Sequence, residues 1–326
     1  MGNTCNRLCA GLLLIASFAA TAQVSSDPIV NWAYPWLSPS DAIKSQINPA
    51  GIRHVPDSNI VYSQGQTVDY FLAPDWHPDE HPKMPPIVKV GRKPSVFACG
   101  FCHRADGSGG PENASINGLS ADYIVEQVKA FQSGKRKAAV APDKGPGSLM
   151  RGVVESINDD EINSAAAYFA AIKPRRNIDV VEAEFIPSIA VNVRVFSHRN
   201  NQQKEPLGNR IIELANDDEQ FENRDTRTQF TAYVPIGSIQ RGQRLAQGLT
   251  GAKTRQCATC HGPELKGTDA APRIAGRSPS YLARQLVDIK YGSRTGTEVS
   301  PMLAVVEQLT SEDILALTAY VSSLSP

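Results

Sequence analysis

The sequence holds few of the residues that bind metals or fill large apolar cores. Its 326 residues include six cysteines, six histidines, four methionines and three tryptophans, and aromatic residues make up 7%. So few cysteines exclude a disulfide-dense scaffold. The formal net charge is zero, so the composition favours neither nucleic acid nor an anionic membrane surface as a partner.

Long apolar runs are also scarce. The clearest one covers residues 8–20, follows Arg7, and is too short to span a bilayer. Ala20-Thr21-Ala22 has the form of an A-x-A cleavage site, which predicts a secretory signal peptide over residues 1–22 and a periplasmic location. An uncleaved N-terminal anchor is the alternative. No later segment is apolar enough to span a membrane, so we expect no transmembrane span in the mature chain.

The four cysteines beyond this signal lie in a five-residue pattern that occurs twice. Cys99, Cys102 and His103 form the first C-x-x-C-H motif, and Cys257, Cys260 and His261 form the second, 158 residues later. Two thiols at this spacing can each add to a vinyl group of one haem, and the following histidine can bind the iron. The sequence therefore predicts two covalently bound haem c groups. One zinc site made from both motifs, or two disulfides, would need the same cysteines, but the histidine in both copies favours haem.

The similarity between the two halves extends well beyond the motifs. Tyr123 and Gln127 correspond to Tyr281 and Gln285 at the same offset, and so do Arg136 and Arg294. This internal repeat predicts two similar helical units. In each we expect a helix at or before the motif, a second over residues 120–132 or 279–290, and a last one capped by Asn158 or Thr310.

The sixth iron ligand decides whether a haem transfers electrons or is open to small molecules. Met150 and Met302 occupy equivalent places ahead of the last helix of each unit, and each follows a loop with glycine or proline. A methionine is more often a core residue, but equivalence within the repeat makes these two the predicted distal ligands. Met84 competes with Met150. The histidines outside the motifs are weaker candidates, since a lone histidine is usually a surface or capping residue: His54, His77, His81 and His198.

Composition divides the chain into five parts. A proline-rich arm that holds all three tryptophans follows the signal, and we expect it to pack on the first haem unit. Between the units we expect a small β insertion, with strands at Val180–Phe185 and Ile189–Phe196 and an acidic loop at Asp217–Glu222. A short helix is expected at Asp41–Ile47. The predicted parts are residues 1–22 (signal), 23–90 (arm), 91–174 (first cytochrome c domain), 175–235 (linker or β insertion) and 236–326 (second cytochrome c domain).

With these motifs the chain resembles the diheme class I cytochromes c, the cytochrome c4 / c553-like group. The resemblance covers the two haem units. It implies a mainly α fold with two tandem cytochrome c domains, covalent attachment at the four cysteines, proximal ligands His103 and His261, and distal ligands Met150 and Met302. It also implies that the carbonyl of Pro272 accepts the ring N–H of His261, where the first unit has Ala114, and that Arg136 and Arg294 pair with haem propionates.

The leading functional hypothesis is a periplasmic carrier of single electrons between a dehydrogenase-type donor and a respiratory acceptor such as a terminal oxidase, with no catalytic residues. Residues 236–326 hold ten basic and seven acidic residues, so this unit is a candidate docking face for an acidic redox partner. Two alternatives remain. One is a diheme oxidoreductase, either a peroxidase or a dehydrogenase for a small sulfur compound, with a labile ligand on one haem. The other is an electron-transfer subunit of a larger dehydrogenase complex.

Overall fold

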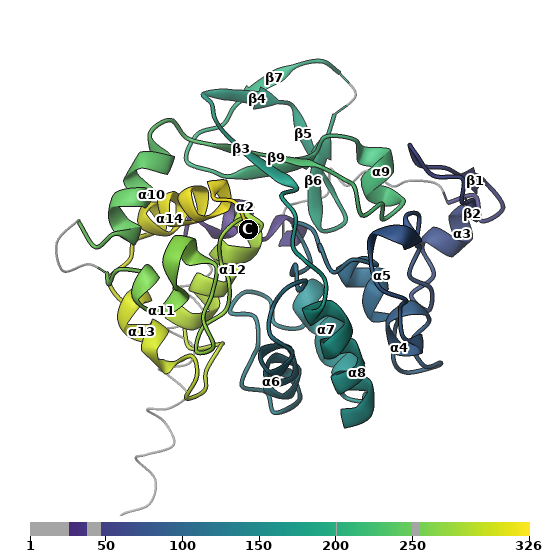
Figure 1. Cartoon of the computed structure of the whole chain (residues 1–326). Helices are drawn as coiled ribbons and strands as arrows, with labels where there is room; N and C mark the ends of the chain where they lie inside the picture. The colour runs from purple at the N-terminus through teal and green to yellow at the C-terminus, as the bar shows by residue number, and fades with distance from the viewer. Residues whose placement is uncertain (1–25, 38–46, 200, 250–253) are drawn as a thin grey trace, which may run out of the picture.

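The structure is a computed structural model that describes residues 26–37, 47–199, 201–249 and 254–326. The predicted signal peptide and, apart from Ile47, the predicted helix at Asp41–Ile47 lie outside these residues. Figure 1 shows one group of helices on each side of the molecule and the strands across its top. The fold is mainly α with small sheets, as predicted.

The first helical unit forms where the repeat predicted it. Its helices are α5 (Cys99–His103), α6 (Ala121–Gln132), α7 (Pro146–Val154) and α8 (Asp159–Ala170). Ser120 caps α6, because its Oγ accepts the N–H of Tyr123 at 3.2 Å. Asn158 caps α8 in a reciprocal capping box with Glu161, which confirms the predicted start of the last helix.

The second unit repeats this order and adds a longer first helix. Its elements are α10 (Ser238–Ala246), α11 (Ala258–His261), the 3-10 turn η3 (Pro263–Leu265), α12 (Pro279–Lys290), α13 (Ser300–Val306) and α14 (Ser311–Ser323). Thr310 caps α14 as predicted. Helix α10 packs closely on α14: a Cβ at Gly242 would lie 1.9 Å from the carbonyl oxygen of Ala316. The first unit has only the four-residue α4 (Pro86–Lys89) in the corresponding place, because prolines precede and begin it.

The segment between the units is a β insertion. Its elements are β3 (Ile178–Glu182), β4 (Phe185–Pro187), β5 (Ile189–Asn192), β6 (Val195–His198), β7 (Lys204–Pro206), β8 (Ile212–Ala215), α9 (Asp218–Glu222) and β9 (Phe230–Val234). Strand β9 lies between β3, to which it is parallel, and β8, to which it is antiparallel. Strands β4 and β7 form an antiparallel pair.

Three local predictions for this segment were wrong. The strand expected at Val180–Phe185 is divided, because β3 ends at Glu182 and β4 begins at Phe185. The strand expected at Ile189–Phe196 is the hairpin β5–β6, because Val193 adopts a left-handed conformation (φ 55°) and turns the chain. The acidic loop expected at Asp217–Glu222 is the short helix α9, because the side chain of Asp217 accepts the N–H groups of Glu219 and Gln220.

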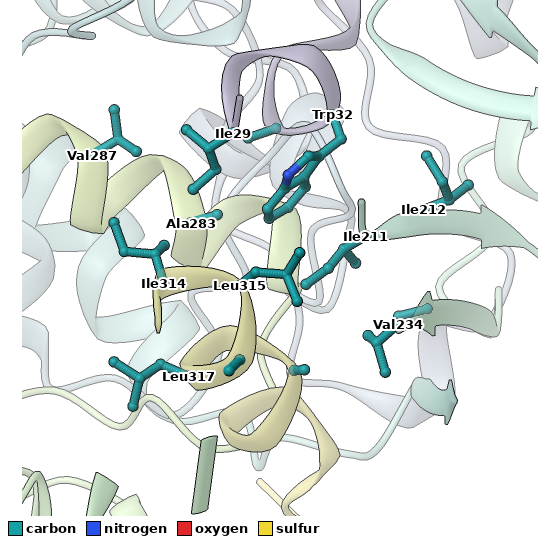
Figure 2. Close-up of a cluster of buried hydrophobic side chains, with 14 of the residues drawn as sticks. Ile29, Trp32, Ile211, Ile212, Val234, Ala283, Val287, Ile314, Leu315 and Leu317 are labelled. Carbon is teal, nitrogen blue, oxygen red and sulfur yellow. The ribbon is translucent and has the colours of Figure 1, made fainter. Parts of the chain in front are cut away.

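The arm contacts both helical units. Its elements are α2 (Val30–Ala33), η1 (Pro35–Leu37), β1 (Ile52–Arg53), β2 (Tyr62–Ser63), α3 (Gln64–Thr67), η2 (Pro78–Glu80) and α4. Residues near its end, including Ala73, Met84 and Val88, pack into the core of the first unit, as expected. Trp32 in α2 does not: it lies in a core with Ala283 of α12, Leu315 of α14 and Ile211 beside β8 (Figure 2). The arm therefore packs on the first unit, as expected, and also on the second, which was not expected.

Among the helices of the described ranges, none is long and apolar enough to cross a membrane.

The close approach of α10 and α14 gives a test of the second unit's packing. We expect Gly242→Ala to lower the free energy of unfolding by about 3 kcal/mol, because the new methyl group meets backbone that cannot move independently. Gly152→Ala in α7 is the matched control. A Cβ there has no atom within 4 Å, so it should raise stability by about 0.5–1 kcal/mol through the helix preference of alanine. Denaturant unfolding followed by circular dichroism measures both, and equal shifts would contradict the packing argument.

Candidate haem sites

Both C-x-x-C-H motifs lie on short helices. The first motif is α5 itself, and Cys257 is the residue before α11. Gly100 lies against the arm: a Cβ there would be 2.8 Å from the Cβ of Ala73 and 3.0 Å from the carbonyl oxygen of Val88. The second motif has Ala258 in this place. The arm therefore packs directly on the first motif.

The two motif histidines have matching hydrogen bonds. His103 Nδ1 lies 2.8 Å from the carbonyl oxygen of Ala114, and His261 Nδ1 lies 2.8 Å from that of Pro272. The carbonyl holds the proton on Nδ1, which leaves the lone pair on Nε2 for a metal. Burial lowers the pKa of both imidazoles and so favours the neutral form that binds metals. The structure thus shows the contact expected at Pro272 and an equal one at Ala114.

A cavity of about 200 Å³ lies beside the first motif. Cys99, Cys102, His103 and Met150 all line it, together with apolar side chains from α6, α7 and α8. Its remaining walls come from loops of the first unit, from Tyr34 and Trp36 of the arm and from residues of the second unit. The structure therefore brings the predicted proximal and distal residues of the first unit to one cavity.

The other candidates for the sixth ligand of the first haem make contacts elsewhere. Met84 is buried in the first unit's core, and it does not line the cavity. His77 Nε2 contacts Asp225 at 3.1 Å, and His81 Nε2 contacts Asp75 at the same distance. Burial would lower the pKa of His81, but the hydrogen bonds to Asp75 and to a backbone carbonyl outweigh it and raise that pKa, which disfavours metal binding.

Outside the first unit, His198 faces Asp218 at 3.4 Å, and neither His198 nor His54 lines the cavity.

The second motif is more open. Cys260 is exposed and Cys257 is half-buried, whereas His261 is buried. Half-buried Met302, in α13, and Cys257 both pack against the core that holds Trp32. The structure thus places the predicted residues of the second site in one unit.

Arg136 and Arg294 form a contact that the sequence did not predict. The Nη2 of Arg136 donates to Tyr281 Oη (3.1 Å) and to Gln285 Oε1 (2.8 Å) of the second unit. In return, the Nη2 of Arg294 donates to Tyr123 Oη (3.1 Å) and to Gln127 Oε1 (2.9 Å) of the first unit. Both side chains are buried between the units. The sequence signal was present, because all three residue types recur at one offset. Pairing of these arginines with haem propionates stays a prediction.

The β insertion supplies a second unpredicted contact. Arg224, which follows α9, donates from Nη1 to the carbonyl oxygen of Phe101 at 3.0 Å, and its guanidinium carbon lies 3.6 Å from the centre of the Phe101 ring. Burial raises the pKa of the neighbouring Cys102 thiol, and the positive charge of Arg224 opposes this rise. Nothing in the sequence pairs residue 224 with the first motif.

The alternatives of a zinc site and of disulfides find no support in the geometry. No disulfide joins any two of the four motif cysteines. Within the part of the chain that the structure describes, no three histidine, cysteine or acidic side chains come together as a metal site.

The chain is similar in sequence to known proteins. Residues 239–325 match the family model described as Cytochrome c. Cytochrome c-554(548) of Halomonas halodenitrificans is 32% identical over 77 residues, which cover 23% of this chain and 86% of that protein. Cytochrome c4 of Azotobacter vinelandii is 24% identical over 230 residues, which cover 69% of this chain and 84% of that protein. The chain belongs to the diheme, cytochrome c4-like cytochromes c.

A further relative is named by its redox role. The thiosulfate dehydrogenase electron acceptor of Thiomonas intermedia (strain K12) is 22% identical to this cytochrome over 248 residues, which cover 74% of this chain and 86% of that protein.

The first cavity of this cytochrome fits covalently bound haem c. Its lining is largely apolar, its two thiols are three residues apart, and a neutral imidazole and a thioether line it. Cys99 and Cys102 would hold the macrocycle, and His103 and Met150 would bind the iron. When bound, the haem supplies a one-electron couple between ferric and ferrous iron. The chain's own part is to orient the imidazole through Ala114 and to exclude water with apolar side chains.

The choice between Met150 and Met84 can be tested with one substitution at each position. We expect Met150→Leu to remove about half of the sulfur-to-iron absorption band of the oxidised protein, because one of two haems loses its thioether. Met84→Leu, a swap of similar volume in the core, should leave the band unchanged. The opposite result would assign the ligand to Met84.

Proposed function

We propose that this cytochrome is a periplasmic diheme electron carrier that takes single electrons from a dehydrogenase-type donor and passes them to a respiratory acceptor. The first haem is held by Cys99, Cys102, His103 and Met150. The second is held by Cys257, Cys260, His261 and Met302. The predicted signal peptide supports the periplasmic location.

The observation that carries this proposal is that Met150 and His103 line the same cavity. With His103 and Met150 as its ligands, the iron would have a raised reduction potential and no open position for a substrate. Electron transfer needs no such site, since no bond forms or breaks at the protein. The geometry therefore favours a carrier over a peroxidase.

A dehydrogenase-type donor is supported by the relative from Thiomonas intermedia, whose name describes an electron acceptor of thiosulfate dehydrogenase. The open edge of the second motif supports that unit as the place of electron exchange, because Cys260 is exposed whereas Cys102 is half-buried. The excess of basic residues in this unit suits an acidic partner.

Optical spectroscopy with carbon monoxide tests the carrier proposal directly. We expect two haems per chain, a sulfur-to-iron band of matching intensity in the oxidised protein, and no spectral change when carbon monoxide is added to the reduced protein. Both irons would then be six-coordinate. Carbon monoxide binding at one haem would overturn the carrier and favour an oxidoreductase with one labile ligand.

Electron exchange at the second unit can be tested with a charge reversal. Exposed Arg255 lies two residues before Cys257. We expect Arg255→Glu to slow oxidation of the reduced protein by ferricyanide several-fold at low salt, with the difference lost at high salt, because a nearby positive charge attracts the anion. Lys204→Glu, at an exposed position of β7 in the β insertion, makes the same change in net charge on an element that lies far from α11 in Figure 1. Equal slowing by both variants would show an effect of net charge alone.

A further inference from the structure

Arg277 of the second unit reaches into the first. It lies just ahead of α12 and is 3% exposed. Its Nη2 donates to the carbonyl oxygen of Ser115 at 2.7 Å. Ser115 follows Ala114, whose carbonyl holds the ring of His103. Arg277 is therefore anchored beside the proximal loop of the opposite unit.

Arg277 lines the first cavity, and its guanidinium has donor capacity left. Its carbon lies 4.6 Å from the centre of the Tyr281 ring, which restricts its orientation. Its Nε is buried and has no hydrogen-bond partner among the described residues. A buried, charged N–H without an acceptor is costly, so this position favours an anionic group inside the cavity.

The other charged side chains of the cavity differ in how they are engaged. Arg284 donates from Nη1 to the carbonyl of Ala33 at 2.8 Å and from Nη2 to that of Pro111, and Arg136 is engaged between the units. Glu112, Asp288, Lys137 and Lys144 also line the cavity. The two carboxylates would repel an anion, so its most favourable place is near the guanidinium groups.

The second unit contributes an arginine to the first cavity, but the first unit contributes no matching arginine to the second site. At the offset of 158 residues that relates the two units, Arg277 corresponds to Leu119. Leucine has no charge and no hydrogen-bond donor on its side chain. The first unit therefore has no equivalent arginine to offer to the second site.

The haem itself carries suitable anions. Its two propionate carboxylates leave the macrocycle on the side away from the vinyl groups that join the cysteines. In Figure 1, α5 with these cysteines and α12 lie on opposite sides of α7. We propose that Arg277 of the second unit binds a propionate of the haem attached to the first unit, so that the second unit completes the first haem's site. This inference rests on the proposed attachment of haem at Cys99 and Cys102, and not on the identity of any redox partner.

The test measures the potentials of both haems in the intact diheme protein. Met150→His exchanges a thioether for an imidazole at the first haem only. The redox wave that shifts in this variant is therefore the wave of the first haem. We expect Arg277→Gln to lower that wave, because a buried positive charge favours ferrous over ferric haem. The expected change is about tenfold in the electron-sharing equilibrium between the haems, or about 59 mV for a one-electron couple.

Arg273→Gln is the matched control. Arg273 is also buried, with 6% exposed, and it also donates across the units, from Nη2 to the carbonyl of Asn117 at 3.2 Å, but it does not line the cavity. It should leave the first haem's wave in place. Equal shifts of that wave in both variants, or no shift in folded Arg277→Gln, would overturn the proposal.

A second readout separates propionate binding from a general loss of charge. Arg277→Lys keeps the charge but loses the fork of donors. We expect Arg277→Lys to have a first-haem potential close to that of the wild-type protein. Its propionate bending modes in the resonance Raman spectrum should still differ from those of the wild-type protein. Unchanged modes would contradict binding, including the case in which Arg277→Gln fails to fold. If the wild-type protein carried only one haem, the proposed diheme function itself would be refuted instead.

Discussion

The arrangement of the two units depends on the buried contact between Arg136 and Arg294. Two like charges at one interface repel, and tyrosine and glutamine side chains of the opposite unit offset this repulsion by accepting their N–H groups. The backbone continues the same symmetry: Lys137 N–H donates to Ser293, and Thr295 N–H donates to Lys135, both at 2.8 Å. The repeat in the sequence is thus a repeat in the interface as well as in the haem sites.

The two sites differ because the arm and the β insertion both cover the first. The arm approaches α5 so closely that position 100 has no room for a side chain, and Arg224 of the insertion packs on Phe101 of the same motif. The second motif has no such cover at Cys260, which is exposed. Electron exchange with a partner protein requires one accessible haem edge. The two motifs are chemically similar, but only the second has an exposed cysteine, so the covered and open sites differ in access.

Local signals in the sequence predicted the local structure well. The caps at Asn158 and Thr310 begin helices. The family resemblance, and not a local signal, implied that the carbonyl of Pro272 faces His261. Predictions failed where the outcome depends on distant contacts or on the backbone conformation of a single residue. Nothing near Trp32 indicates that it packs on α12 and α14, and alternation over Ile189–Phe196 cannot reveal the turn at Val193. The role of the repeated arginines was missed because a repeat shows which residues match and not which unit each one faces.

The first site is built from three parts of the chain, whereas the residues that define the second belong to one unit. Trp36 of the arm and Arg277 of the second unit both line the first cavity. Arg284 joins these parts, because it donates to Ala33 of the arm and to Pro111 of the first unit. The arm is in turn anchored by Trp32 in the second unit's core. The first cavity therefore needs all three parts docked together.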